Sequence, residues 1–422
     1  MLDITFIREN VDLVKEGMKN KGEKETGVVD TVILKYDEWR NAVTDAGRLR
    51  AESNTRSKEI GKLMGQGKKE EARKIIKETG ESKEKIKELE ESTSILRDEL
   101  DQLLYKIPNV PDSSVPVGHS EADNEVFKTW GEPAGGDGKA PHWEIAGKKQ
   151  WLDFDRGSKV TGAGFPFYLG KLASLQRALI NFFINEAEKA GYLEMQTPFF
   201  VNESSARGTG QIPDKEDMMY EIQRDQFFVI PTAEVPITNF HRDEILELNE
   251  LPLKYVAHTP CWRREAGSYG KDVRGLNRLH QFDKVELVKI VHPGHSNDEL
   301  EKLRLHAESL LEKLELPYRT LLMCTGDMGF TQSKKYDLEV WSPGQQLWLE
   351  VSSCSNFGSF QARRMQLRYR DDKGKIEMVH TLNGSGLALP RVVAAILETY
   401  QTKEGDVNIP DVLQPFTGSA KI

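Results

Sequence analysis

Two charged residues in the segment TPCWRREAG, residues 259–267, have a spacing that could let each of them bind a different part of one ligand. Arg263 and Glu265 are two residues apart, so a strand that continues through them would place both side chains on one face. The planar guanidinium of Arg263 suits a phosphate, and the Glu265 carboxylate suits a donor such as an amino group. The alternative interpretation is a cross-strand ion pair, which contributes little to stability.

A second segment, LHQFDKVE at residues 279–286, follows a stretch rich in glycine and arginine. Phe282 and Glu286 are four residues apart and share a face of the predicted strand. The Phe282 ring could stack on a base. Glu286 interrupts an apolar strand, where a carboxylate seldom lacks a partner, so it could hold the ammonium group of a ligand.

Glu350 ends an apolar strand in a third segment, LWLEVSSCSN at residues 347–356, and small hydroxyl residues follow it. Mg²⁺ usually takes few protein ligands when phosphates supply the others. One carboxylate with hydroxyl groups and the phosphates of ATP could therefore form a Mg²⁺ shell. A serine-rich turn without a metal is the alternative.

The fourth segment, TLNGSGLALPR at residues 381–391, leads into a predicted helix. Gly384 and Gly386 would let a ligand approach the backbone closely. Pro390 suits the first turn of a helix, so Arg391 is expected near a helix N-terminus, where anions are favoured. The alternative is an arginine that simply points into solvent.

The surrounding sequence predicts an α+β fold with an antiparallel sheet, which would position these four segments. Apolar runs bounded by turn residues predict strands at residues 226–230 and 281–291. A helix is expected over residues 172–190, because Gly191 provides a C-terminal stop. Another helix is expected over residues 391–400.

Residues 1–107 are rich in lysine, glutamate and leucine and predict a coiled coil of two long helices. The predicted seam of the second helix consists of Ile86, Leu89, Thr93, Leu96, Leu100 and Leu103. That of the first consists of Trp39, Val43, Ala46, Arg50, Ser53, Ser57, Ile60 and Met64, with weaker packing at its polar positions. Two glycines within residues 64–67 favour a chain reversal between the helices. Roughly 35 residues per arm would give a lever of about 50 Å.

The predicted tip of this hairpin is basic. Between Arg56 and Lys77 the sequence has eight positive and three negative residues, a sum of +5 in a chain whose net charge is −9. A phosphate backbone is a natural partner, because each neutralised phosphate releases counterions. A solvated lysine-rich surface is the alternative, and charge alone does not decide between them.

The composition suits a soluble enzyme with several domains. The chain has 422 residues, of which 38% are hydrophobic and 30% charged, and no apolar run is long enough to cross a membrane. We expect a helical hairpin domain at 1–107, a connector at 108–141 and a catalytic domain at 142–422. The absence of a secretory signal and three widely separated cysteines predict a cytoplasmic location, and no cysteine or histidine spacing suggests zinc.

In this order, the segments resemble class II aminoacyl-tRNA synthetases, specifically the bacterial-type seryl-tRNA synthetase family, over essentially the whole chain. The motifs that carry the resemblance are PTAEVP at 231–236, RREAGS at 263–268, VSSCSN at 351–356, and LNGS at 382–385 with Arg391. Several long motifs in one order are more specific than any of them alone. Pro390 stands where many relatives have glycine, but it fits a helix start.

The resemblance implies a role for each matching residue. The implied catalytic residues are Arg263 on the α-phosphate and Arg391 on the γ-phosphate. The implied ATP-binding set is Arg263, Arg264, Glu265, Leu279, Phe282, Glu350, Val351, Ser352, Ser353 and Arg391. The implied serine-binding set is Thr232, Ala233, Glu234, Glu286, Asn383 and Ser385. Glu350 and Ser353 are the implied Mg²⁺ ligands, and strict alternation would separate them, so the strand must end or bulge there.

The family resemblance also implies the reaction and the partners. Such an enzyme activates L-serine with ATP to seryl-adenylate and transfers serine to the 3′ end of tRNA(Ser), with tRNA(Sec) as a further candidate. A homodimer is implied, built around a helix, a strand and Pro198. Two other hypotheses stay open: a serine adenylase that loads a carrier protein, and a catalytically inactive relative that binds tRNA.

Overall fold

The computed structural model of the chain describes residues 1–135, 138–213, 217–265 and 274–422. Residues 266–268 of the predicted RREAGS motif, and most of the glycine- and arginine-rich stretch after it, lie outside the described residues. The chain forms two compact units, which we describe separately. The first comprises Met1–Lys19 and Glu23–Pro108, and the second comprises Asn20–Gly22 and Asn109–Ile422.

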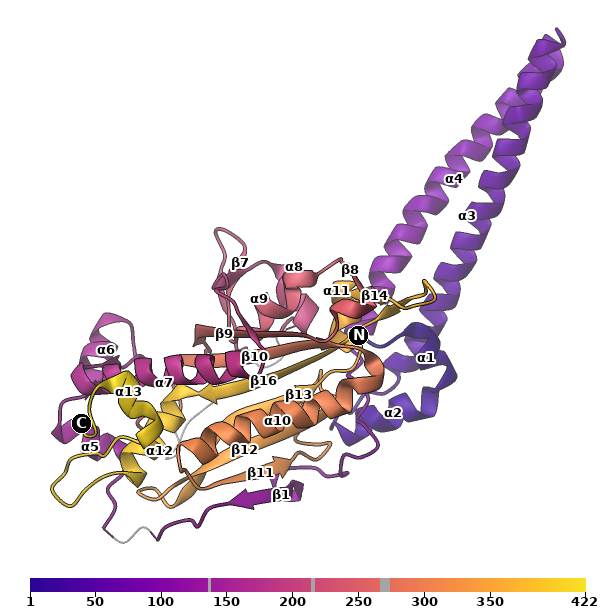
Figure 1. Cartoon of the computed structure of the whole chain (residues 1–422). Helices are drawn as coiled ribbons and strands as arrows, with labels where there is room; N and C mark the ends of the chain where they lie inside the picture. The colour runs from indigo at the N-terminus through magenta and orange to yellow at the C-terminus, as the bar shows by residue number, and fades with distance from the viewer. Residues whose placement is uncertain (136–137, 214–216, 266–273) are drawn as a thin grey trace. The chain divides into compact units, whose positions relative to one another are not determined.

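The first unit is a long helical hairpin preceded by two short helices (Figure 1). Helices α1 (Ile4–Glu9) and α2 (Val11–Asn20) lead into α3 (Val28–Gly65) and α4 (Lys69–Leu104). Gly67, between the long helices, has a φ of +78°, a conformation that glycine adopts without strain. The predicted hairpin and its chain reversal are therefore confirmed.

The seam between α3 and α4 matches the prediction in only one helix. In α4 every predicted seam position is at least partly buried, and Leu100 is fully buried. In α3 the seam positions with reduced exposure are Trp39, Ala42, Ala46, Leu49, Ser53, Arg56, Ile60 and Leu63. The predicted positions 43, 50, 57 and 64 are exposed, so this part of the prediction was wrong. Successive seam residues of one helix can be three or four positions apart, and the packing of the partner helix decides which spacing occurs at each turn.

The second unit is built on an eight-stranded sheet with the order β1-β11-β12-β13-β16-β10-β9-β4. Its strands are β1 (Glu125–Trp130), β4 (Leu193–Glu194), β9 (Leu253–Trp262), β10 (Gln281–Val291), β11 (Tyr318–Leu322), β12 (Lys334–Ser342), β13 (Leu347–Asn356) and β16 (His380–Ala388). Neighbouring strands are antiparallel except for the edge strand β4, which runs parallel to β9. The antiparallel α+β architecture is thus confirmed, and β1 of the expected connector belongs to this sheet.

Helices α7 (Gly170–Lys189), α10 (Ser296–Lys313) and α12 (Leu389–Thr399) cover one face of the sheet (Figure 1). The helix over 172–190 is therefore confirmed, and α12 begins at Leu389. In β10, the odd-numbered Val285 and Leu287 pack into the core beneath these helices. Because side chains alternate along a strand, the even-numbered Phe282 and Glu286 point to the opposite face.

Smaller helices and strands complete the second unit. They are the helices α5 (His142–Lys148), α6 (Phe154–Val160), α8 (Glu203–Thr209), α9 (Glu234–Thr238), α11 (Phe360–Met365) and α13 (Gln414–Thr417), with β2 (Leu152–Asp153), β3 (Phe167–Tyr168), β5 (Phe200–Val201), β6 (Tyr220–Ile222), β7 (Phe227–Val229), β8 (Ile245–Glu247), β14 (Arg368–Arg370) and β15 (Ile376–Met378). A second apolar cluster joins Val288 and Ile290 of β10 to α9 and α11. Within the described ranges, no helix has the length and apolar character needed to cross a membrane.

Candidate active site

All four predicted segments line one cavity of about 520 Å³ on the open face of the sheet. Arg263 and Arg391, which are far apart in the chain, both border it. Fourteen of the sixteen nominated residues line this cavity: Thr232, Glu234, Arg263, Glu265, Leu279, Phe282, Glu286, Glu350, Val351, Ser352, Ser353, Asn383, Ser385 and Arg391. The convergence that the sequence predicted is therefore present.

Arg263 and Glu265 reach the cavity by a different route from the one expected. Strand β9 ends at Trp262, and Glu265 has a φ of +50°, so strand alternation does not extend through them. The Arg263 guanidinium lies 5.2 Å from the centroid of the Phe282 ring. Glu265 accepts a hydrogen bond of 2.8 Å from Arg278, so its ion-pair partner comes from the segment that precedes β10.

Buried charge gathers at the end of the cavity formed by β10 and β16. The Lys284 ammonium lies 2.5 Å from a Glu286 oxygen and donates a hydrogen bond of 2.9 Å to the Thr232 hydroxyl. Asn383 donates a hydrogen bond of 3.0 Å to the other Glu286 oxygen. Sequence reasoning missed Lys284, although its even number in β10 places it on the same face as Phe282 and Glu286.

Glu234, the first residue of α9, is a second buried carboxylate at this end. Gln361 donates a hydrogen bond of 2.7 Å to Glu234. Burial, followed by the nearby Glu286 carboxylate, raises the pKa of Glu234 to about 7. An incoming cation would therefore meet two carboxylates, one of which ionises near neutral pH.

A bulge in β13 brings Glu350 and Ser353 together. Glu339 of β12 pairs with Glu350 and the adjacent Leu338 pairs with Ser352, so Val351 is the extra residue. The Ser353 hydroxyl donates a hydrogen bond of 3.1 Å to Glu350. The irregularity that the metal hypothesis required is therefore confirmed.

The environment of Glu350 favours its ionised form. The protein around the cavity removes water from Glu350, and this desolvation opposes ionisation. The charges of Lys335 and Arg391 outweigh the effect and lower the pKa of Glu350. No group of three histidine, cysteine, aspartate or glutamate residues in the described part of the chain could hold a metal by itself. One carboxylate beside one hydroxyl does fit Mg²⁺ that takes its other ligands from phosphates and water.

Arg391 lies in the first turn of α12, beside Pro390, as expected. It donates hydrogen bonds of 3.1 Å to the Asn277 carbonyl and 2.7 Å to the Glu350 carbonyl. Two backbone acceptors therefore orient its guanidinium along the cavity wall. Arg391 is therefore not an arginine that simply points into solvent.

The two glycines of the fourth segment face away from the cavity, so their predicted role was wrong. A Cβ atom on Gly384 would lie 3.1 Å from Leu303 in α10, and one on Gly386 would lie 3.3 Å from Leu287. Gly384 pairs with Leu287 in β10, whose side chain points into the core. These glycines make room for core packing, whereas Asn383 and Ser385 between them face the cavity.

Two nominated residues do not line the cavity. Ala233 is fully buried, and Arg264 forms an ion pair of 3.0 Å with Asp217. Their predicted roles stay predictions. Besides Lys284, sequence reasoning did not nominate the polar lining residues Gln211, Asn277, Arg278, Asp327, Gln332, Lys335 and Ser355.

Family models match both units of the chain. The model "Seryl-tRNA synthetase N-terminal domain" matches residues 1–111, and the model "tRNA synthetase class II core domain (G, H, P, S and T)" matches residues 219–400. A serine–tRNA ligase of Salinibacter ruber is 56% identical over 100% of this chain and 99% of its own length. One from Geobacter sulfurreducens is 51% identical over 99% of each chain.

Solved structures agree with these matches over the full length. A seryl-tRNA synthetase from Pyrococcus horikoshii, crystallised with ATP, superposes with a TM-score of 0.92 at 37% identity and covers 100% of this chain and 99% of its own. A cytoplasmic serine–tRNA ligase from Naegleria fowleri, in complex with AMP, gives a TM-score of 0.87 at 30% identity, with 100% and 98% covered. This chain belongs to the seryl-tRNA synthetase family of class II aminoacyl-tRNA synthetases.

Proposed function

We propose that this protein activates L-serine with ATP and transfers it to the 3′ end of tRNA(Ser). The observation that carries the proposal is that one cavity has two chemically different ends. Arg263, Arg391 and Glu350 gather where a nucleoside triphosphate and its metal would bind. Glu234 and Glu286 gather where an amino-acid ammonium would bind.

In the first step, a carboxylate oxygen of serine attacks the α-phosphorus of ATP in line. The bond from this phosphorus to the bridging oxygen breaks, and pyrophosphate leaves. Arg263 stabilises charge on the α-phosphate and Arg391 on the γ-phosphate, while Phe282 stacks on adenine and Glu265 accepts from its amino group. No protein nucleophile is required, so positioning and electrostatics supply the catalysis.

The second step transfers the seryl group to RNA. The terminal ribose hydroxyl of tRNA attacks the carbonyl carbon of seryl-adenylate, and AMP leaves with the electrons of the broken bond. The buried Thr232 and Ser385 and the partly buried Asn383 surround the serine side chain in this proposal. A pocket that hydrogen-bonds the serine hydroxyl rejects alanine, because the analogue would leave buried polar groups unpaired. Threonine must be rejected by its size.

Mg²⁺ is the proposed metal, with Glu350 and Ser353 as its protein ligands. When bound, it would neutralise charge on the phosphate oxygens. The hydrogen bond between these two side chains supports their assignment to one ligand shell. Lys335, whose ammonium lies 2.8 Å from Asp337, adds a further positive group to the cavity wall.

The helical hairpin of residues 1–107 is the proposed tRNA-binding part, with residues 108–141 as connector and 142–422 as the catalytic part. Its basic segment around residues 56–77 supports contact with a phosphate backbone. The family resemblance further suggests a homodimer, a cytoplasmic location and tRNA(Sec) as a second acceptor. Charging of transcribed tRNA(Ser) and tRNA(Sec) in parallel would test the choice of RNA.

Serine-dependent exchange of pyrophosphate into ATP tests the proposed function. We expect exchange with L-serine but not with alanine, and serine attachment to tRNA(Ser) but not to a carrier protein. Exchange without tRNA charging would instead support the carrier-loading hypothesis. The absence of exchange with serine and every other amino acid would support the inactive relative.

A further inference from the structure

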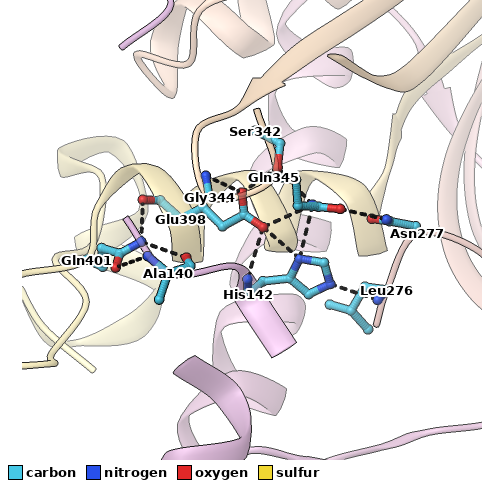
Figure 2. A network of polar contacts seen from close by, with 9 residues as sticks. All are labelled: Ala140, His142, Leu276, Asn277, Ser342, Gly344, Gln345, Glu398 and Gln401. Atoms are coloured by element: carbon cyan, nitrogen blue, oxygen red, sulfur yellow. Dashed lines mark hydrogen bonds and ion pairs between the residues drawn. The ribbon is translucent and has the colours of Figure 1, made fainter. Parts of the chain in front are cut away.

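A polar network centred on two fully buried side chains lies beside the candidate active site, and its residues Leu276 and Asn277 line the cavity (Figure 2). Its centre is the hydrogen bond between His142, the first residue of α5, and Glu398, in the last turn of α12, whose side chains are both 0% exposed. A buried carboxylate is costly unless it is well paired. The network therefore calls for a reason beyond general packing.

Glu398 accepts hydrogen bonds from two segments of the chain, the start of α5 and residues 342–345. It accepts hydrogen bonds from the backbone N–H of His142 at 3.0 Å and from its Nδ1 at 2.8 Å. It also accepts from the Ser342 hydroxyl, the Gly344 N–H and the Gln345 amide. Burial opposes ionisation, but the hydrogen bonds from His142 and Ser342 outweigh it and lower the pKa of Glu398. The carboxylate thus orients the His142 ring.

The other ring nitrogen of His142 reaches the segment that precedes β10. Its Nε2 accepts a hydrogen bond of 2.8 Å from the backbone N–H of Leu276 (Figure 2). The ring is therefore neutral, with its proton on Nδ1. A Cβ atom on Gly275 would lie only 2.3 Å from this Nε2, so the backbone passes directly over the ring. The Arg274 guanidinium lies 4.9 Å from the Trp143 ring, which adds a second contact to α5.

Helix α12 is connected to the segment before β10 at two points. Arg391 and Glu398 are seven residues apart, so they lie on one face of the helix, two turns from each other. Glu398 holds Leu276 through His142, and Arg391 donates directly to the carbonyl of the next residue, Asn277. The Asn277 side chain also donates 2.7 Å to Gln345. Residues 276 and 277 are thus held at both ends against α12.

We propose that His142 is a positioning residue for the ATP side of the cavity. It fixes Leu276, which sets the Asn277 carbonyl that orients Arg391. The same segment continues to Arg278, which pairs with Glu265, and to Leu279 on the cavity wall. Within the described part of the chain, Glu234 and Glu286 at the amino-acid end pair with Gln361, Asn383 and Lys284 and form no hydrogen bond or ion pair with this network. The inference rests on the proposed function only for its assignment of ATP to this side.

The test compares two substitutions that each keep one half of the imidazole's hydrogen bonding. His142→Asn keeps a donor near Nδ1 for Glu398 but removes the acceptor for Leu276, whereas His142→Gln can place an acceptor near Nε2. An unsatisfied buried N–H costs enough to weaken a dependent interaction about tenfold. We expect His142→Asn to raise the Kd and KM for ATP about tenfold and to leave the KM for serine within about twofold, with His142→Gln between it and the wild type.

A control and a second variant make the result decisive. His306→Asn replaces a part-buried histidine of α10 that packs against Tyr192, away from the cavity, and should leave the KM for ATP unchanged. Gly275→Ala leaves His142 intact but would crowd the His142 and Trp143 rings and strain a backbone whose φ is +67°, so it should displace this segment and weaken ATP binding as His142→Asn does. Calorimetry with ATP alone on the full chain measures this without serine, so a failure of serine-dependent exchange would count against the proposed function only.

Unchanged ATP affinity in folded His142→Asn and Gly275→Ala proteins would overturn the inference. Equal losses for ATP and serine, with a lower melting temperature, would also overturn it, because they would indicate a purely structural role. If His142→Asn does not fold, the Gly275→Ala result alone decides.

Discussion

The ionisation of Glu234 yields a quantitative prediction about serine recognition. Burial and the neighbouring Glu286 raise its pKa from 4.5 to about 7, which corresponds to about 3 kcal/mol for ionising this carboxyl in place. Serine binds as an ammonium and favours the ionised form. The KM for serine should therefore fall as the pH rises through 7 and become constant above about pH 8.

Glu234→Gln keeps an oxygen that can accept from Gln361 but cannot become charged. A hydrogen bond to a charged group contributes about 1.5–3 kcal/mol, so the variant's KM for serine should rise about 10- to 100-fold. Its KM should also lose the pH dependence between 6 and 8. Serine-dependent pyrophosphate exchange across this range measures both effects, and the KM for ATP in the same experiments is the internal control.

The same shift predicts the stability of the ligand-free protein. Because the folded pKa is raised, the folded state binds an extra proton between pH 4.5 and 7, and this stabilisation is lost as the pH rises through 7. Glu234→Gln should therefore be more stable than the wild type at pH 8, by up to about 3 kcal/mol, and lose that advantage near pH 5. Denaturant unfolding at both pH values measures the difference.

Two results for serine recognition would refute the reasoning. One is a wild-type KM for serine that does not change from pH 6 to 8, and the other is a Glu234→Gln variant whose KM keeps the pH dependence of the wild type.

Three further predictions follow from the architecture. Deletion of residues 31–105 should leave pyrophosphate exchange nearly intact and abolish tRNA charging, whereas equal loss of both activities would show that the hairpin is not a dedicated RNA-binding part. Arg391→Ala should remove exchange and leave the circular dichroism spectrum unchanged, and normal exchange would refute its role. Gly384→Val should destabilise the protein by about 1–3 kcal/mol, because its side chain would meet Leu303 and Cys354, while the KM for ATP in the folded fraction stays unchanged.

The sequence predicted most of the framework because local signals and long-range packing agree there. The limits of β10 at 281–291, the helix before Gly191 and the hairpin turn at Gly67 all follow from periodicity and glycine placement. The seam of α3 could not be predicted from its own sequence. Ala42 and Val43 lie three and four residues after Trp39, and either spacing fits a coiled-coil seam until the packing against α4 is known.

The site was harder to predict wherever backbone geometry departs from regular alternation. Glu265 adopts a positive φ, so its direction could not follow from its distance to Arg263. Which face Gly384 presents depends on its pairing with Leu287, a contact between distant strands. His142 was missed because its partners, Leu276 and Glu398, are more than a hundred residues away in the chain.

A crystal structure with a non-hydrolysable seryl-adenylate analogue tests the central claim most directly. The account predicts adenine beside Phe282, the phosphate group within hydrogen-bond distance of Arg263, and the serine ammonium between Glu234 and Glu286. An analogue bound outside this cavity, or one whose ammonium points away from both carboxylates, would contradict it.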